Sequence, residues 1–374
     1  MTAPVTEPLD PLALHARARD GDVKAQIALS AIFDREGRHD VALGWLQQAA
    51  AGGSLEAETA LGSRLLVGRA APFAPAQGAE RIHRAAEMGG VEAAMRAAVL
   101  LLRGLGRPPS GDAALDLLLS AALKDNVDAS AQLAVLANDE DLLARVDRGA
   151  PLSEDRLKRA RRAIDLPAWL GPPTPAEISE TPRIRIFSDF LPPLACLWIR
   201  RRADRKLDVL RVYDAEAGGV RTDGIRTSRG AGFGLLDTDV VLTLVAARMA
   251  VASGLRLETF EPANVLNYQV GQQYRLHYDY LDPAAPALAE ALHRQGQRTA
   301  TFLAYLNDGY AGGETAFPRL EWDFKAKAGD ALLFFNVDLD GRPVERSLHA
   351  GLPPTDGEKW VLSQWIRDRA QPLI

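Results

Sequence analysis

A repeat with a period of 36 residues constrains the fold of the N-terminal part more than any other feature of the sequence. The segments WLQQAAAGGSLEAETAL, RIHRAAEMGGVEAAMRA and LLLSAALKDNVDASAQL align without gaps. They share a pair of adjacent alanines and a later single alanine: Ala49-Ala50 with Ala57, Ala85-Ala86 with Ala93, and Ala121-Ala122 with Ala129. Alanine and leucine dominate each unit, so each is predicted to form two antiparallel helices. Neighbouring units then complete each other's apolar face, which is typical of an α-solenoid.

The repeated units resemble a known family of helical repeats. Ala-Ala-x-x-Gly, followed by a helix rich in alanine and leucine, is similar to Sel1-like repeats, which are relatives of tetratricopeptide repeats, over about residues 10 to 137. Asp22-Val23-Lys24-Ala25 is an earlier copy, and Asp125 replaces the glycine in the last one. Such a solenoid either binds a protein partner or substrate on its concave surface, or is an appendage that stabilises or dimerises the chain. The first interpretation rests on architecture alone.

Composition limits the classes of protein to which the chain can belong. Its 374 residues suggest two domains, or three, and 47% apolar and 25% charged residues are typical of a soluble globular protein. A net charge of −5 does not support nucleic-acid binding, which usually requires a basic surface. We interpret the basic run RLKRARR at 156–162 as the solvated face of a helix. Cys196 is the single cysteine, so no intrachain disulfide can form. Without a signal pattern or a bilayer-length apolar run, we expect a cytoplasmic location and no membrane partner.

The repeat fades after residue 139, and the chain changes character. A helix is predicted at 153–165, and the stretch after it is rich in proline and glycine, which indicates a connector. We therefore predict a helical repeat domain at 1–150, a helix with a Pro-rich linker at 151–182, and a second domain at 183–374.

The second domain is predicted to begin with a strand near Ile184. Helices are expected at about 192–204 and 240–253, where apolar residues have helical spacing. The Gly-rich segment 226–234 lacks the lysine and the spacing of a phosphate-binding loop. We expect it to form a mobile loop near the active site.

After residue 260 the sequence is largely of β character. The predicted strands are 264–270, 274–280, 299–306, 331–336 and 360–366. Many short strands separated by glycine and proline indicate a sandwich or jelly roll. The predicted class is therefore a multidomain α + β protein, with an N-terminal α-solenoid and a C-terminal β fold flanked by helices.

A candidate metal site begins with His277 and Asp279. On a strand, side chains two residues apart point to the same face. Chance can supply such a pair, and non-haem iron sites use two histidines and one carboxylate, so a further histidine is needed. His293 lies in a polar, helix-like segment and is expected at the surface. His349 lies late in the β region, where a strand could return beside the first.

The strand that opens at Lys359 supplies a candidate anion-binding residue. By strand periodicity, Lys359, Val361, Ser363 and Trp365 share one face. A lysine that points inward with Trp365 can bind an anion in the barrel. Arg367 has the same parity and is the alternative for that role.

The C-terminal half resembles a known enzyme family. The motifs YQVGQQYRLHYDY, RTATFLAYLND, GGETAFP, AGDALLFFN, SLHAG and GEKWVLSQWI are similar, in this order, to those in the catalytic domain of prolyl 4-hydroxylases. These enzymes are Fe(II)- and 2-oxoglutarate-dependent dioxygenases. The resemblance runs from about Ile184 to the last residue, and it implies a double-stranded β-helix.

The resemblance also implies the roles of individual residues. His277, Asp279 and His349 would be the iron ligands, and Lys359 would bind the distal carboxylate of the cosubstrate 2-oxoglutarate. Tyr268 and Thr315 would support that same carboxylate, and Trp365 would form a pocket wall close to the iron; the alternatives are packing for the two aromatic residues and a turn hydroxyl for the threonine. Ascorbate is a further cofactor that the family implies.

Three functions follow from these patterns. The first is a hydroxylase that acts on a prolyl residue of a protein or peptide, which the repeats help to select, with release of succinate and CO2. The second is a 2-oxoglutarate-dependent hydroxylase of another residue or of a small molecule. The third is a non-catalytic repeat scaffold whose β domain has a structural or sensing role.

Overall fold

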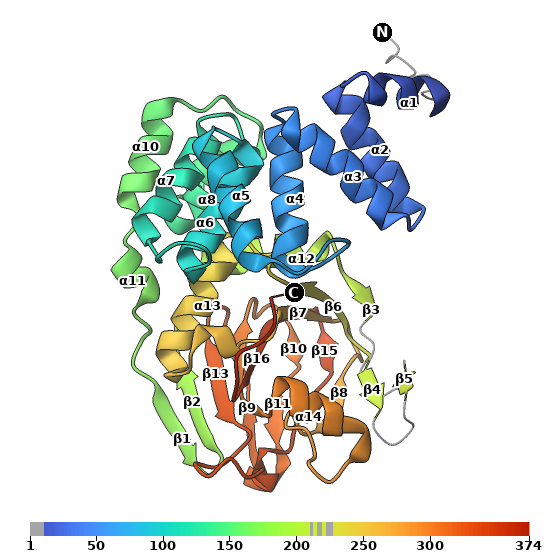
Figure 1. Cartoon of the computed structure of the whole chain (residues 1–374). Coiled ribbons are helices and arrows are strands. Elements are labelled where there is room, and N and C mark those ends of the chain that lie inside the picture. Colours follow the sequence, from blue (N-terminus) through green and yellow to red (C-terminus); the bar gives the residue numbers. More distant parts are fainter. Residues whose placement is uncertain (1–10, 210–211, 215–218, 222–226, 374) are drawn as a thin grey trace. The chain divides into compact units, whose positions relative to one another are not determined.

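The computed structural model describes residues 11–209, 212–214, 219–221 and 227–373 (Figure 1). The chain forms two compact units, apart from single residues at the C-terminal end. Among the described residues, the first unit contains 11–133 and 142–163, and the second contains 134–141 and those from 164 to 372. The first is helical, and the second is built around antiparallel sheets.

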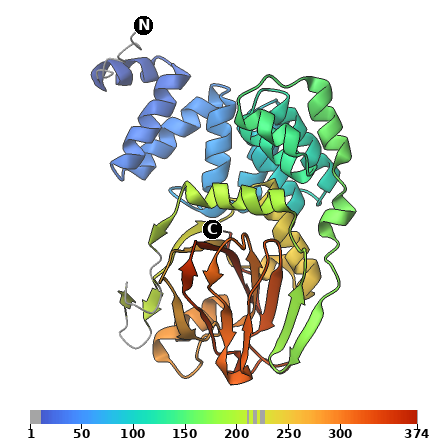
Figure 2. The ribbon, with the colours of Figure 1, turned by 180° about the vertical axis from the view of Figure 1, so that it is seen from behind.

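The helical part confirms the predicted α-solenoid. Its helices are α1 (Pro11–Arg19), α2 (Val23–Arg35), α3 (His39–Ala51), α4 (Leu55–Val67), α5 (Pro75–Glu87), α6 (Val91–Arg103), α7 (Gly111–Ala122), α8 (Val127–Leu136), α9 (Glu140–Asp147) and α10 (Glu154–Ala163). From α1 to α7, each helix packs against the next one in the sequence (Figure 2). The alanine pairs lie at the ends of α3, α5 and α7, so one repeat corresponds to one pair of helices.

Short polar side chains start the second helix of three of the repeats. Each accepts a hydrogen bond from the backbone N–H three residues later, which satisfies a donor that the helix itself leaves unpaired. These bonds join Asp22 to Ala25, Ser54 to Ala57 and Asn126 to Ala129, at 3.1, 3.1 and 2.8 Å. The second helix of each of these repeats therefore begins at the same position within the repeated sequence.

Small residues let the helices of the solenoid approach closely. Ala57, Ala93 and Ala129 are each 0% exposed. Gly62 of α4 lies against Gly78 of α5, where an added Cβ would come within 2.8 and 2.5 Å, respectively, of the other residue's carbonyl oxygen. A larger side chain at either glycine would force these two helices apart.

The second unit contains a large antiparallel sheet. In the described residues it has eight strands in the order β1-β2-β13-β9-β16-β7-β6-β3. Its strands are β1 (Ala176–Glu180), β2 (Arg183–Phe187), β3 (Asp208–Val209), β6 (Arg229–Phe233), β7 (Ala263–Tyr268), β9 (Arg298–Tyr305), β13 (Ala331–Phe335) and β16 (Lys359–Arg367). Neighbours in this order come from distant parts of the sequence, as in a jelly roll.

A smaller sheet lies opposite. Its order is β12-β11-β14-β8, with bounds Trp322–Phe324, Thr315–Phe317, His349–Gly351 and Tyr274–His277. Two further pairs are β10 (Ala311–Gly312) with β15 (Pro354–Asp356), and β4 (Val212–Asp214) with β5 (Gly219–Arg221). Tyr305 and Phe334 from the large sheet form one buried cluster with Phe317 from the small sheet. The predicted double-stranded β-helix is confirmed.

Helices flank the sheets, as predicted. They are α11 (Leu166–Leu170), α12 (Pro193–Asp204), α13 (Val240–Ser253) and α14 (Ala289–Gln295), with short 3-10 turns η1 (Leu257–Thr259), η2 (Pro286–Leu288), η3 (Pro318–Leu320) and η4 (Glu345–Ser347). α12 packs against β6 and β7. Asp239 caps α13 and also accepts a hydrogen bond from the Trp198 indole of α12 at 2.9 Å, which joins the two helices. Within the described residues, no helix has the length and apolar character needed to cross a membrane.

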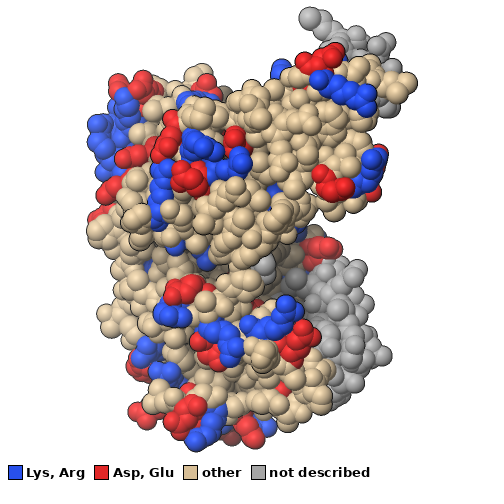
Figure 3. Space-filling model, viewed as in Figure 1, with Lys and Arg blue, Asp and Glu red and all other residues tan. Residues whose placement is uncertain are grey.

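Basic side chains lie beside acidic ones over much of the face in Figure 3. The basic run of α10 follows this pattern. Lys158 pairs with Glu154 on the same helix, and Arg161 pairs with Asp112 and Asp116 at 3.0 and 2.9 Å. Part of this run therefore serves to attach α10 to α7 instead of facing solvent alone.

Two local predictions differ from the structure. Within the Gly-rich segment, Arg229–Phe233 forms strand β6 instead of a mobile loop, and Arg226 lies outside the described residues. Backbone pairing with β3 on one side and β7 on the other outweighs the low strand propensity of glycine. In the predicted linker, Leu166–Leu170 is helical and Ala176–Glu180 is edge strand β1. β1 is polar and mostly exposed, so it lacks the apolar alternation by which a strand is found.

Candidate metal centre and cosubstrate pocket

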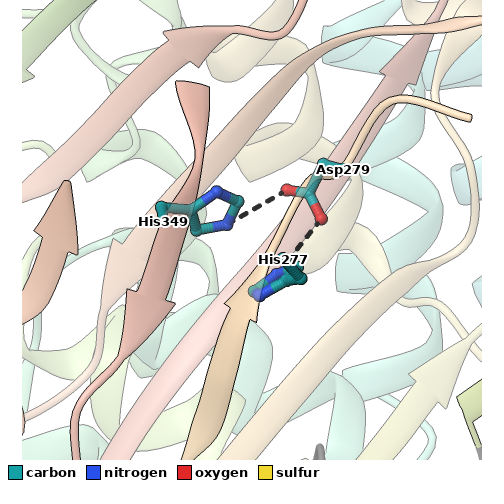
Figure 4. Close-up of side chains that lie close together, drawn as sticks. All are labelled: His277, Asp279 and His349. Carbon is teal, nitrogen blue, oxygen red and sulfur yellow. Dashed lines mark ion pairs between the residues drawn. The ribbon is translucent and has the colours of Figure 1, made fainter. Parts of the chain in front are cut away.

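Two antiparallel strands bring the candidate metal ligands together. His277 ends β8, His349 begins β14, and the two residues are directly paired across the strands. Asp279 lies two residues beyond the end of β8. One donor atom from each residue lies within 4.8 Å of the other two, and both Nε2 atoms are 3.6 Å from the carboxylate (Figure 4).

The predicted strand 274–280 is shorter in the structure. β8 stops at His277 because its partner β14 begins at His349, and the 3-10 turn η4 precedes that strand. Strand alternation therefore does not by itself orient Asp279. The chain past the strand end still directs its carboxylate to both imidazoles.

Backbone carbonyls fix the two imidazole rings. Nδ1 of His277 lies 2.7 Å from the carbonyl oxygen of Arg275, and Nδ1 of His349 lies 3.0 Å from that of Ser347. A ring that donates its Nδ1–H to such a carbonyl carries its lone pair on Nε2. In both histidines Nε2 is the atom that faces Asp279.

A buried polar chain holds the carboxylate. The hydroxyl of Thr301 on β9 donates to Oδ2 of Asp279 at 2.6 Å, and Nδ2 of Asn336 donates to that hydroxyl at 3.1 Å. Both residues are buried. Sequence reasoning missed them. The available signal was that Thr301 shares strand parity with Leu303 and Tyr305, so it is a polar residue on an inward face.

Electrostatics favour metal-binding protonation states for Asp279 and His349. Burial alone would raise the pKa of the Asp279 carboxyl, but the neighbouring rings of His349 and His277 hold it well below its usual range. Burial, reinforced by the ring of His277, lowers the pKa of His349 to about 4. Near neutral pH the site therefore offers a carboxylate and a neutral imidazole at these positions.

Lys359 is a buried cation at the start of β16. It is 2% exposed, and its Nζ donates to the carbonyl oxygen of Gly313 at 2.7 Å. Its Nζ also lies 5.3 and 5.6 Å from the ring centroids of Tyr305 and Tyr268. Burial lowers the pKa of this amine to about 7, and nearby Lys325 acts in the same direction. In the part of the chain that is described, no carboxylate lies within ion-pair distance of it.

All seven residues that the sequence analysis selected line one pocket. They are Tyr268, His277, Asp279, Thr315, His349, Lys359 and Trp365. The inward face predicted for β16 also reaches the pocket, through Val361 and Ser363. The Thr315 hydroxyl lies 2.7 Å from that of Tyr305, so it is held by a buried partner. The outlying histidine, His293, is exposed as expected.

A second buried network stands beside the pocket. Glu261 receives two hydrogen bonds from Arg298, at 2.7 and 2.9 Å, and one from Arg367 at 2.5 Å. Arg367, the alternative to Lys359, is therefore engaged elsewhere. The guanidinium of Arg298 stacks on Trp365 at 3.9 Å from the ring centroid. Sequence reasoning did not find this network, because its members are far apart in the chain.

Comparison with known proteins places this site in a family. Residues 263–367 match the 2OG-Fe(II) oxygenase superfamily. Over 217 residues, the chain is 36% identical to prolyl 4-hydroxylase 1 of Arabidopsis thaliana, covering 54% of this chain and 74% of that relative. This chain belongs to the 2OG-Fe(II) oxygenase superfamily. It is an oxygenase that depends on 2-oxoglutarate, so the non-catalytic scaffold is not the function of its β domain.

Two solved structures are each similar to a part of this oxygenase. A viral collagen prolyl hydroxylase from Paramecium Bursaria Chlorella virus-1, in a 2OG complex, is 28% identical with a TM-score of 0.39, covering 49% of this chain and 94% of its own. A Sel1 repeat protein from Oxalobacter formigenes is 28% identical with a TM-score of 0.30, covering 32% of this chain and 94% of its own.

Proposed function

We propose that this oxygenase hydroxylates a prolyl residue of a protein or peptide. One atom of dioxygen enters a carbon–hydrogen bond of the substrate to give a carbon–hydroxyl bond, and the other enters succinate as 2-oxoglutarate loses CO2. One observation carries the proposal: His277, Asp279 and His349 converge in the same pocket as the buried Lys359. Similarity to a prolyl 4-hydroxylase supports the choice of a prolyl residue.

The donor set fits Fe(II). Two imidazole nitrogens and one carboxylate on one side of the metal are the ligands that non-haem iron oxygenases use, and they leave positions open. Bound iron and 2-oxoglutarate supply the oxidising chemistry. The chain's own part is orientation: the carbonyls of Arg275 and Ser347 set the two rings, and Thr301 holds one oxygen of Asp279.

Lys359 fits the distal carboxylate of 2-oxoglutarate. Burial of an ammonium group costs desolvation free energy, and an ion pair with a carboxylate offsets that cost. The distal carboxylate of bound 2-oxoglutarate would supply this partner for Lys359. Tyr268 lies opposite Lys359 on the neighbouring strand β7, and Thr315 lines the same pocket. We assign both hydroxyls to the same carboxylate. Trp365, held by Arg298, forms a wall between this pocket and the substrate.

Succinate release tests the iron site. We expect release that requires both Fe(II) and 2-oxoglutarate and that is lost in His277→Ala. The matched control is His293→Ala, since His293 is an exposed histidine of the same domain. Unchanged turnover in His277→Ala would exclude the proposed iron site.

Mass spectrometry of candidate substrates tests the prolyl assignment. A proline that gains one oxygen supports it. Oxygen gained by another residue or by a small molecule, with the same dependence on 2-oxoglutarate, supports the second function instead.

We further propose that the repeats hold the protein substrate and that ascorbate sustains turnover. A photo-cross-linker at exposed Met88 on the solenoid should capture a substrate that the oxygenase hydroxylates. Turnover measured with and without ascorbate should show more cycles with it. If no substrate is cross-linked, the proposed role of the repeats is rejected. If ascorbate does not increase the number of cycles, its proposed role is rejected.

A further inference from the structure

A wide groove adjoins the cosubstrate pocket. Its volume is about 1130 Å3, and it shares Tyr274, Asp279 and Trp365 with that pocket. Tyr278 and Tyr280 extend its lining with aromatic surface. Grooves lined by aromatic side chains suit extended, proline-rich segments, whose backbone is already ordered before binding. The groove is thus continuous with the proposed reaction centre and much larger than the pocket beside the metal ligands.

Helix α14 and the segment after β16 form one wall of this groove. α14 contributes Glu290, Ala291, Arg294 and Gln295, and the segment contributes Ala370–Pro372. α14 has seven residues, and helices this short are unstable by themselves. Its position therefore depends on what holds it.

Residues 367–371, which we call the strap, hold the end of α14. The last carbonyls of a helix have no partner within it, and the strap supplies donors for them. Its hydrogen bonds run from Arg369 to the carbonyl of His293 at 2.7 Å, from Gln371 to that of Gln295 at 2.9 Å, and from Arg367 to that of Gly296 at 2.6 Å. Asp368 exchanges two further bonds with Gln297, each 3.0 Å.

The strap fits closely around Gly296. This residue has a φ of +78°, in the left-handed region that favours glycine. A Cβ there would lie 1.8 Å from Oδ1 of Asp368 and 2.7 Å from Nε of Arg369. Backbone conformation and strap contact therefore require the same small residue at the same position.

We propose that the strap fixes α14 as a wall of the peptide groove and so sets the affinity for the prolyl substrate. It does not set affinity for 2-oxoglutarate, because no strap residue lines the pocket around Lys359. Arg369 and Gln371 are positioning residues that act through α14. This inference rests on the proposed function and assigns the part of the fold that selects its peptide.

The experiment compares the full chain with its Arg369→Ala/Gln371→Ala variant. The probe is a short synthetic peptide of alternating proline and alanine. We expect the KM for this peptide to rise about tenfold, while kcat and the KM for 2-oxoglutarate change by less than about twofold. Hydrogen exchange of the amides in 289–297 should accelerate. Arg369→Lys, which keeps a donor, should recover most of the lost affinity.

The control is Arg342→Ala. Arg342 is an exposed arginine that pairs with Asp340 in a turn and does not line the groove. It should change neither KM nor exchange in α14.

Three results would overturn the proposal. Exchange in α14 that is unchanged in the double variant means that the strap does not hold the helix. Faster exchange with an unchanged peptide KM means that α14 is not a wall of the peptide groove. If wild-type protein does not bind the peptide, the groove does not bind the proline-rich segment that we assign to it. Failure of the proposed function is a separate result: wild-type protein would then release no succinate from 2-oxoglutarate, or would add oxygen only to a residue other than proline or to a small molecule.

Discussion

Replacing Thr301 with valine tests how the chain orients the carboxylate ligand. The Thr301 hydroxyl donates to Asp279 at 2.6 Å and accepts from Asn336 at 3.1 Å. Valine keeps the branched shape but removes the hydroxyl, so both partners lose a hydrogen bond in a buried place. Asp279 then rotates more freely, and the donor atoms no longer meet a metal in one fixed arrangement.

The structure gives the size of the expected effect. A hydrogen bond to a charged group contributes about 1.5–3 kcal/mol. At about 1.4 kcal/mol for each factor of ten, this corresponds to about 10- to 150-fold in an equilibrium constant. Loss of partners that orient metal ligands typically lowers metal affinity by about 10- to 100-fold. We therefore expect the Kd of the protein for a divalent metal to rise by about 10- to 100-fold in Thr301→Val.

Anaerobic titration with Fe(II), and titration with Mn(II) as a stable substitute, measures this Kd. The matched control is Thr299→Val on the same strand, because the Thr299 hydroxyl donates to the carbonyl of Ile366 at 3.2 Å and not to a candidate metal ligand. The control should leave the metal Kd unchanged. A folded Thr301→Val protein whose metal Kd equals that of the control would refute the reasoning.

Three further perturbations address other parts of the molecule. Lys359→Met should raise the KM for 2-oxoglutarate by about 100-fold or more, because it removes one member of a buried charge pair; an unchanged KM contradicts the assignment. Burial lowers the pKa of Lys359 from its ordinary value of 10.5 to about 7. Between these two pH values the amine is therefore protonated in the unfolded state and mostly neutral in the folded state. In urea titrations without cosubstrate, the free energy of unfolding should therefore rise from pH 7 to pH 10 in wild type and be flatter in Lys359→Met. Glu261→Gln leaves the Arg298 and Arg367 guanidinium groups without a carboxylate and should cost about 3–5 kcal/mol of stability in the same assay, whereas a loss below about 1 kcal/mol would contradict the network's role. Gly78→Val should lower the melting temperature of the solenoid and leave the KM for 2-oxoglutarate unchanged; an unaltered melting temperature would contradict the close approach of α4 and α5.

The proposed iron site illustrates how far sequence reasoning extends. The strand periodicity of β16 placed Lys359 and Trp365 on one face, and both line the same pocket. The expected return of a strand beside His277 is observed as the direct pairing of His277 with His349. The local rule succeeds for β16 because the shared face of Lys359 and Trp365 depends on alternation within a single strand.

Other parts of the site depend on contacts that the sequence does not display. Thr301 and Asn336 meet because β9 and β13 are neighbours, with Phe335 opposite Ala300. Glu261 meets Arg298 and Arg367 only once β7, β9 and β16 share a sheet. Strand order is set by the whole fold, so single polar residues on these strands carry no local sign of their partners.

The sequence by itself determined the helical repeats, the β character of the C-terminal half and the identity of the candidate ligands. Repeats and alternation are short-range properties, and burial of apolar faces enforces them along the chain. Only the tertiary structure decided that Arg229–Phe233 is a paired strand, that Asp279 is held by Thr301 of β9, and that residues 367–371 fasten α14. Each of these depends on hydrogen bonds between segments far apart in the sequence, and those bonds exist only after the sheets have formed.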